Sequence, residues 1–442
     1  GDLFSWIVKD IVVDKHPRLI GQLTSAPGIF IGPLFYYLLI PFFYLTKMDP
    51  VGAIIPITIL GILTVASYYY VFSKLFNNTV GLIASFLYAT LISLVTFDRR
   101  VVPSTPTNIW LIWYFFVVVQ IARGNLNVLP LLGLLIGLIW HIHVALLPAL
   151  AAIPIALLVS RKVPTIKQVA AFITALFIPS IPLLVFEFRH GFSQFMSLIQ
   201  NFTAEHGGGS GMEKFQLTII KLSENIHRLF FYPQTLPAIN HTLFVVLILA
   251  SGILLAKKKI ISYKELFVFY GWTGTVIIFY TLSSTILSEY YLANIEIIFL
   301  AIASLLLYAT YKFIPMGRYI SLAILSIILI KNVNYFLTTD IYHKGYNERK
   351  AAALFIIQDA AKNDLPCISV SYITDPGENV GFRYFFWLNN LPFRIFSFLD
   401  FSDFYSFSFS CKNKVNFKTQ NSYISAIFHS RNFNILFNSK RS

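Results

Sequence analysis

The sequence predicts an all-α polytopic membrane protein that carries a small α/β segment near its C-terminal end. Two observations of composition support this class. The 442 residues are 56% hydrophobic and only 12% charged, whereas soluble globular domains carry roughly a quarter charged residues. Mean hydropathy is +0.68, and apolar stretches suited to membrane helices recur along the chain. Water therefore cannot be the solvent for most of the surface.

Residues 1–50 are expected to form one external segment. Ile29–Leu45 is apolar, but Pro33 and Pro41 interrupt it. Counting it as a span would also break the alternation of basic loops along the chain. We interpret it as an interfacial or re-entrant helix on the outer face. The chain begins with glycine rather than methionine, so a first span or signal anchor is expected upstream.

Residues 51–332 are expected to form a multi-span transmembrane domain. A span needs about 20 apolar residues. Basic residues gather in alternate loops, such as Arg161–Lys162 and Lys257–Lys259, which assigns those loops to the cytoplasmic side. The candidate spans are Val51–Val71, Val80–Phe97, Ile109–Ile121, Val128–Trp140, Ala145–Val159, Val169–Phe186, Leu243–Ala256, Leu266–Leu282, Leu292–Tyr311 and Ile320–Ile330.

The remaining segments are more polar. Residues 187–241 read as a long external loop with a flexible glycine-rich centre at residues 207–211. Residues 333–395 are expected to form a small external α/β segment, with helices over Asn347–Lys362 and Asn379–Leu388 and a strand over Cys367–Ile373. Residues 396–442 have low complexity and are interpreted as a disordered or non-native tail. Cys367 and Cys411 are the only cysteines, so the sequence predicts no disulfide framework.

The net charge of +14 fits positive-inside loops and a basic tail. No basic stripe on a soluble fold is visible, which argues against a nucleic-acid partner. Ionisable residues are nearly absent from the spans, which argues against an ion-coupled transporter. Polar residues collect instead at the inferred outer ends of spans. Those proposed to bind a phosphate-bearing substrate are Arg99, Arg100, His141, His143, Glu187, Arg189, His190, Glu289 and Tyr290.

These residue types suit an anionic, lipid-anchored substrate. Arginine presents a planar fork of donors to phosphate, histidine can donate to phosphate or shuttle a proton, and a carboxylate could accept the proton of an attacking hydroxyl. Plainer readings stay open: a solvated charge run at residues 98–100, interfacial anchors at 187–190 and an aromatic belt at 289–291. His141 and His143 lie two residues apart, so on a helix they point to different sides.

The chain resembles the GT-C membrane glycosyltransferases, specifically the bacterial branch related to protein O-mannosyltransferases and aminoarabinose transferases. The resemblance covers roughly residues 1–390 and rests on the order and spacing of several short motifs. These are Leu19-Ile20-Gly21, Thr24-Ser25, Gly28, residues 32–39, Pro41-Phe42-Phe43, residues 74–77, residues 80–84, residues 186–190 and residues 289–292.

The resemblance implies a donor sugar on a polyprenyl phosphate and inversion at the anomeric carbon. It also implies an aspartate base in the first external loop. In these relatives that aspartate opens an acidic motif just before the position of Asp2, so the principal base is expected upstream and Asp2 is a weak substitute. Val102-Pro103-Ser104 stands where the relatives often have Asn-Pro. Some GT-C enzymes bind a divalent metal ion, but no ligand set stands out here.

The sequence therefore predicts a multi-pass glycosyltransferase of the cell membrane, of hexosyl or pentosyl type. It would move a sugar from a polyprenyl-phosphate donor to a hydroxyl of a lipid, glycan or protein acceptor at the extracytoplasmic face. One alternative is a transporter or flippase of lipid-linked sugars, for which an internal repeat and a polar path through the membrane would be expected; neither is visible. The other is a catalytically incomplete membrane scaffold.

Overall fold

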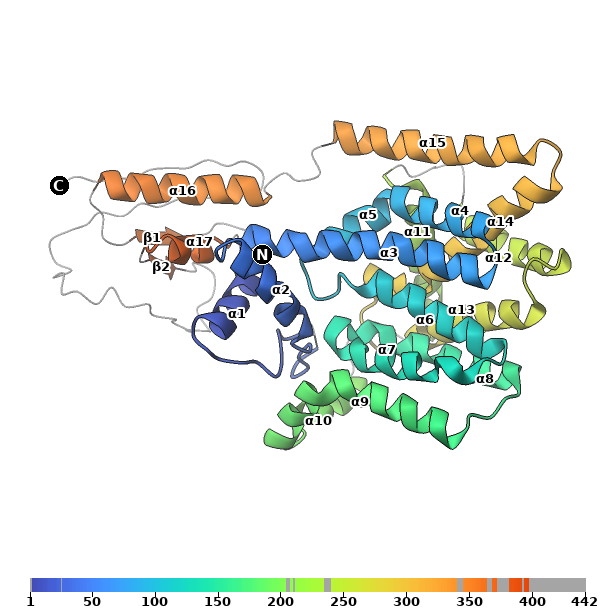
Figure 1. Ribbon diagram of the computed structural model, residues 1–442, viewed down its shortest axis with the longest axis horizontal. Coiled ribbons are helices and arrows are strands. Elements are labelled where there is room, and N and C mark those ends of the chain that lie inside the picture. Colours follow the sequence, from blue (N-terminus) through green and yellow to red (C-terminus); the bar gives the residue numbers. More distant parts are fainter. Residues whose placement is uncertain are drawn as a thin grey trace. The chain divides into compact units, whose positions relative to one another are not determined.

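Apolar helices make up most of the chain in the computed structural model (Figure 1). The structure describes residues 2–24, 26–203, 207–209, 211–233, 240–339, 345–363, 368–371, 381–391 and 393–396. Cys367, Cys411 and the expected tail beyond Phe396 lie outside these residues. The chain forms two compact units, one of residues 1–16, 40–52 and 340–442 (unit 1) and one of residues 17–39 and 53–339 (unit 2).

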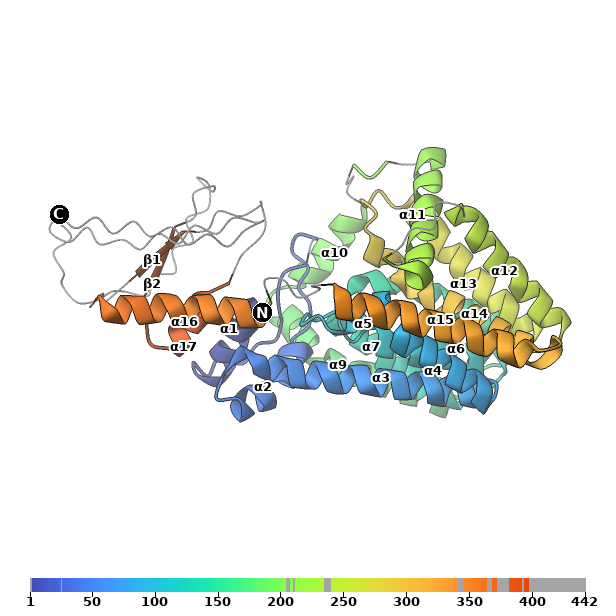
Figure 2. The ribbon, with the colours of Figure 1, turned by 90° about the horizontal axis from the view of Figure 1, so that it is seen from above.

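Unit 2 contains the helices that coincide with the expected spans. Its long helices run roughly along one direction, whereas α11 crosses them steeply (Figures 1 and 2). The α-helices are α3 (Ile54–Leu75), α4 (Asn78–Thr90), α5 (Ile92–Asp98), α6 (Thr107–Ala122), α7 (Leu129–Ile142), α8 (Ala152–Ser160), α9 (Ile166–Arg189), α10 (Ser193–Thr203), α11 (Gly211–Phe231), α12 (His241–Lys257), α13 (Tyr263–Leu282), α14 (Glu296–Phe313) and α15 (Gly317–Thr338). Short 3-10 helices are η2 (Leu126–Val128), η3 (Val144–Ala151) and η4 (Glu289–Ile295).

In the described part of the chain, five helices are long and apolar enough to cross a membrane, or six if the bent pair α4–α5 counts as one span. Several shorter apolar helices lie beside them. These helices confirm the all-α polytopic class. The segment at residues 187–241, expected as an external loop, contains the two amphipathic helices α10 and α11.

Local sequence signals fix where several helices begin. The Asn77 side chain accepts a hydrogen bond from the Val80 amide at the start of α4. Thr165 with Gln168, and Ser262 with Glu265, form reciprocal capping boxes at the starts of α9 and α13. Each cap satisfies backbone N–H groups that have no partner within the helix.

Close helix packing in unit 2 depends on small residues. α7 packs along α9, and α3 packs along α4. Gly133 and Gly137 lie four residues apart on α7, and an added Cβ there would meet the Phe172 and Leu176 carbonyl oxygens of α9 at 2.1 and 2.4 Å. Glycine thus permits the two backbones to approach, as is common between membrane helices.

One ion pair joins three helices of unit 2. Arg123, at the end of α6, donates from Nε to the Glu265 carboxylate of α13 at 2.7 Å and from Nη2 to the Leu75 carbonyl of α3 at 2.8 Å. The Glu265 side chain is only 5% exposed. Because a buried carboxylate needs such a partner, we interpret this pair as a structural tie.

Unit 1 joins the first segment of the chain to the C-terminal α/β segment. It contains α1 (Asp2–Val12), the second half of α2 (Leu34–Leu45), most of η1 (Pro50–Ala53), α16 (Tyr346–Lys362) and α17 (Arg383–Leu388). Strands β1 (Ile368–Ser371) and β2 (Phe393–Phe396) pair in parallel. The predicted helix–strand–helix order over residues 347–388 therefore matches α16, β1 and α17. The predicted domain division at residues 50, 332 and 395 stays a prediction.

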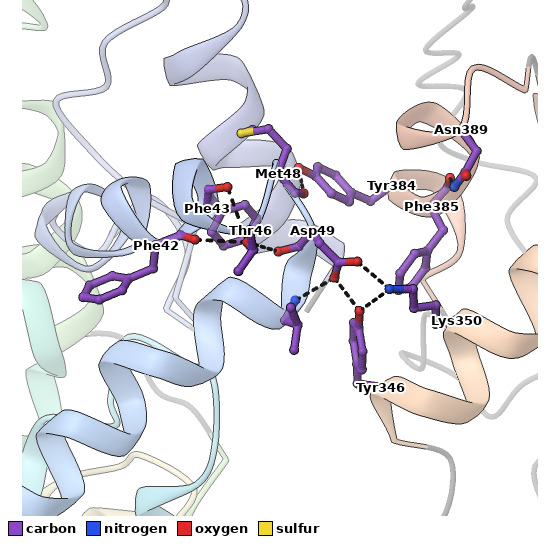
Figure 3. A network of polar contacts seen from close by, with 11 residues as sticks. Phe42, Phe43, Thr46, Met48, Asp49, Tyr346, Lys350, Tyr384, Phe385 and Asn389 are labelled. Atoms are coloured by element: carbon purple, nitrogen blue, oxygen red, sulfur yellow. Dashed lines mark hydrogen bonds and ion pairs between the residues drawn. The ribbon is translucent and has the colours of Figure 1, made fainter.

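Polar contacts and a small core hold unit 1 together. Ala353, Ile356, Phe382, Phe385 and Phe386 are among the buried residues that α16 and α17 share. Figure 3 shows the Asp49 carboxylate facing Lys350 and Tyr346 of α16. It also shows the Tyr384 hydroxyl of α17 donating to the Met48 carbonyl at 2.8 Å.

Candidate functional site

The loop at residues 21–32 folds back on itself and docks on the end of α7. Leu23 and Phe30 form an antiparallel bridge. The Gly32 amide donates to the Trp140 carbonyl at 2.7 Å, and the Leu34 amide donates to Nδ1 of His141 at 3.3 Å. An added Cβ on Gly32 would meet His141 Nδ1 at 2.2 Å. Glycine at this position is therefore required by the close approach of the histidine ring.

This loop forms one wall of a cavity of about 430 Å³. The other walls come from η3, α10, the end of α13 and the segment that leads into η4. Most of the lining is apolar, and the polar members are mainly hydroxyl groups, one amide and one imidazole. The lining residues are Thr24, Ala26, Pro27, Ile29, Ile31, His143, Val144, Ala145, Leu147, Pro148, Leu198, Asn201, Phe279, Tyr280, Thr285, Ile286, Ser288 and Tyr291.

His143 is the predicted site residue that lines this cavity. Its Nδ1 accepts from the Ala145 amide at 3.0 Å, which caps η3. A neutral imidazole in this arrangement carries its proton on Nε2. Beside it, the rings of Tyr280 and Tyr291 stack with centroids 5.8 Å apart. The cavity thus combines a mostly apolar lining with a small set of polar groups, as ligand sites commonly do.

Lys214 lies behind the cavity wall and donates a hydrogen bond to a residue of that wall. It was not among the predicted site residues. Its side chain on α11 is buried, with the residue 1% exposed. The ammonium donates to the carbonyl of Thr285, which lines the cavity, at 2.6 Å and to the Gly208 carbonyl at 2.7 Å. Burial lowers the pKa of Lys214. An ammonium has three donors, of which the described residues occupy two.

His141 points away from the cavity lining. Its Nδ1 accepts from Leu34, and its Nε2 lies 2.7 Å from the Pro179 carbonyl of α9. A backbone donor on one nitrogen and a backbone acceptor on the other identify the neutral Nε2–H tautomer. His141 therefore joins α7, α9 and the 21–32 loop.

The predicted group at residues 187–190 lies at the junction of α9 and α10. Glu187 is 8% exposed, and its Oε2 accepts from the Phe195 amide at 3.2 Å. Within the described chain, its Oε1 is buried with no hydrogen-bond partner. Arg189 is exposed in the last turn of α9, and His190 stacks on Phe186 with ring centroids 4.1 Å apart. Glu187 thus fixes the first turn of α10.

The predicted Arg99 and Arg100 lie at the end of α5, outside the cavity lining. The Arg99 guanidinium lies 5.1 Å from the Phe336 ring centroid on α15, and that of Arg100 lies 5.5 Å from Phe97. Asp98 accepts from the Tyr88 hydroxyl at 2.5 Å and from Asn108 at 2.9 Å. These contacts hold Asp98 between α4 and α6.

The remaining predictions concern Glu289 and Tyr290, Asp2, and a metal site. Glu289 and Tyr290 begin η4, but their side chains lie outside what the structure describes. Asp2 belongs to unit 1, where its carboxylate accepts from the Tyr384 amide at 2.9 Å and from Arg383 Nε at 3.2 Å. In the described ranges, no group of three or more His, Cys, Asp or Glu side chains is placed to hold a metal ion.

Comparisons with known proteins relate this fold to membrane glycosyltransferases. Residues 27–186 match the profile of the family described as dolichyl-phosphate-mannose-protein mannosyltransferase. The matched segment runs from the cavity loop through α9. No curated protein matches the chain.

A solved structure shows the same architecture. The crystal structure of ArnT from Cupriavidus metallidurans bound to undecaprenyl phosphate covers 90% of this chain and 82% of its own, with 11% sequence identity and a TM-score of 0.53. At this identity the likeness shows the fold. Together with the family match, it confirms the GT-C resemblance inferred from the sequence.

Proposed function

We propose that this protein transfers a sugar from a polyprenyl-phosphate donor to an acceptor hydroxyl at the extracytoplasmic face of the cell membrane. The observation that carries this proposal is the cavity between the 21–32 loop, η3, α10 and the end of α13, with its apolar walls and its few polar groups. A similar fold binds undecaprenyl phosphate in ArnT. The side of the membrane follows from the basic loops of the opposite helix ends.

In this proposal the cavity receives the phosphate end of the donor. Lys214 supplies a positive charge behind the Thr285 wall, and the Nε2–H of His143 supplies a donor within the cavity. A buried cation beside a largely apolar cavity is weakly screened, so it attracts a phosphate in that cavity. Arg99, Arg100, Arg189 and His190 stay proposed contacts to donor phosphate, together with His141, Glu187, Glu289 and Tyr290 as proposed substrate-binding residues.

The proposed reaction is an inverting glycosyl transfer. The acceptor hydroxyl gives its proton to a carboxylate base while its oxygen attacks the anomeric carbon. The bond between that carbon and the phosphate oxygen breaks, and polyprenyl phosphate leaves with the electron pair. Asp2 is the weak candidate for the base because Arg383 and the Tyr384 amide already engage both of its oxygens.

Binding of undecaprenyl phosphate and of undecaprenol to the purified protein tests this proposal. We expect Lys214→Gln to weaken binding of the phosphate by about tenfold or more, since a charge-assisted hydrogen bond contributes about 1.5–3 kcal/mol. Binding of undecaprenol should change little. Lys221→Gln, about two helical turns further along α11 and paired with Glu224, is the matched control. Equal affinity of wild type and Lys214→Gln for the phosphate would refute the assignment of Lys214.

A further inference from the structure

Helix α10 has two opposite faces with different surroundings. Gln194, Ser197, Leu198 and Asn201 follow the i, i+3, i+4, i+7 spacing of a single helix face. The Gln194 side chain accepts from the Phe30 amide at 2.9 Å, Asn201 donates to the Pro27 carbonyl at 3.0 Å, and Leu198 lines the cavity. This face therefore packs on the cavity loop.

The other face of α10 is apolar and exposed. Phe195, Met196 and Ile199 lie on the opposite side of the helix, and Phe192 directly precedes it. Phe195 and Met196 are 53% and 54% exposed. In water, so many neighbouring apolar side chains would be unfavourable. More than half of the surface of Phe195 and Met196 is uncovered in the described chain, so the environment of this face is inferred from the surface beside it.

The surface that adjoins this face is the lipid-facing side of α9. That helix is a candidate span with several exposed apolar side chains, among them Phe177, Ile181 and Phe188. Figure 1 shows α10 following directly at the end of α9, on the edge of unit 2. The chain turns there through Gly191 and Phe192, both with positive φ. α10 thus starts at the depth where a membrane span ends.

We propose that α10 docks in the bilayer interface, with its Phe195–Met196 face in the lipid and its Leu198–Asn201 face closing the cavity. The helix carries no charged residue, so apolar burial, rather than attraction to anionic headgroups, supplies the attachment. Arg189 and His190 at the preceding turn lie where long basic side chains reach the headgroups. The bilayer then contacts the outer face of α10, whose inner face forms part of the cavity wall. This arrangement does not depend on which ligand the cavity binds.

Spin labels on single cysteines test this docking. The chain has two cysteines, so Cys367→Ser with Cys411→Ser gives a cysteine-free background. Phe195→Cys and Met196→Cys place labels on the outer face, and Ser193→Cys places the control label on the exposed polar flank of the same helix. The protein is reconstituted in phosphatidylcholine vesicles, and label relaxation by oxygen is compared with relaxation by a water-soluble nickel complex.

We expect labels at positions 195 and 196 to be relaxed mainly by oxygen and the label at 193 mainly by the nickel complex. Equal relaxation by the nickel complex at all three positions would place α10 in water and overturn the proposal. Low accessibility of positions 195 and 196 to both reagents would also overturn it, because another protein surface would then cover this face. Two outer-face labels guard against a local effect of one substitution.

Discussion

The Lys350 ammonium lies 2.6 Å from the Asp49 carboxylate, although 301 residues separate them in the sequence. The same carboxylate accepts from the Tyr346 hydroxyl and, at 3.0 Å, from the Val51 amide. This cluster, shown in Figure 3, ties α16 to the segment that precedes α3. It is the main polar connection in the described part of unit 1 beside the Asp2–Arg383 pair.

Removing this ion pair should loosen α16. We expect Lys350→Gln to reduce the stability of unit 1 by about 1 kcal/mol, since the pair is partly exposed and solvent screens it. Amide hydrogen exchange across Tyr346–Lys362 measures the effect. Lys362→Gln, exposed at the other end of α16, should leave exchange unchanged. If both variants exchange like the wild type, the pair does not hold α16.

The same pair predicts the pH dependence of α16. Burial acts to raise the pKa of Asp49, but hydrogen bonds from Lys350, Tyr346 and Val51 hold it below its ordinary value. The hydrogen bond to Asp49 raises the pKa of Lys350 to about 12. The stability that ionised Asp49 gives to α16 is lost as the pH falls through the lowered pKa of Asp49. The stability that protonated Lys350 gives is lost as the pH rises through about 12. Exchange protection, corrected for intrinsic rates, should therefore stay level across neutral pH; a midpoint there would contradict the assignment.

Substitution of two glycines by alanine tests whether the contact between the 21–32 loop and His141 stabilises the protein. Gly32→Ala should destabilise the protein by about 1–3 kcal/mol, because the added methyl group forces the His141 ring away from Leu34. Gly61→Ala, in α3 with nothing within 4 Å of the added Cβ, should be neutral or slightly stabilising. Thermal unfolding in detergent compares them. Equal melting temperatures would show that the loop does not depend on this contact.

Arg99 and Arg189 are both proposed to bind the donor phosphate, and they occupy different surroundings. Arg189 is exposed at the end of α9, whereas Arg99 lies against Phe336 of α15. We expect Arg99→Gln or Arg189→Gln to weaken undecaprenyl phosphate binding by about tenfold where the side chain contacts the phosphate. Arg318→Gln, in the first turn of α15, serves as the control. Unchanged affinity in both variants would remove the arginines from the donor site.

Each of the ten predicted spans overlaps an apolar helix, although in the described chain only five or six are long and apolar enough to cross a membrane. Hydropathy ended the last predicted span at Ile330, yet α15 continues to Thr338. Tertiary partners explain the difference. Lys331 donates to carbonyls at the end of α11, including that of Phe231 at 3.1 Å, and Asn332 donates to the Thr90 carbonyl at 2.8 Å. A hydropathy window of about 20 residues contains no information about hydrogen-bond partners that lie one hundred residues or more away in the sequence.

The cavity was harder to predict. Its walls come from four segments far apart in sequence. Of the predicted site residues whose side chains the structure describes, only His143 lines it. Lys214 was missed because it stands in a segment read as a polar loop, where α11 in fact buries residues such as Thr218, Leu222 and Ile226. The 3.6-residue spacing of those residues was the signal that could have revealed the helix.

Filling the cavity tests the central claim most directly. Ala145 lines it, and Ala145→Trp should occupy part of its volume and weaken undecaprenyl phosphate binding by about tenfold or more. Leu158→Trp, on an exposed position of α8, should bind like the wild type. Undiminished binding by a folded Ala145→Trp variant would contradict a donor site in this cavity.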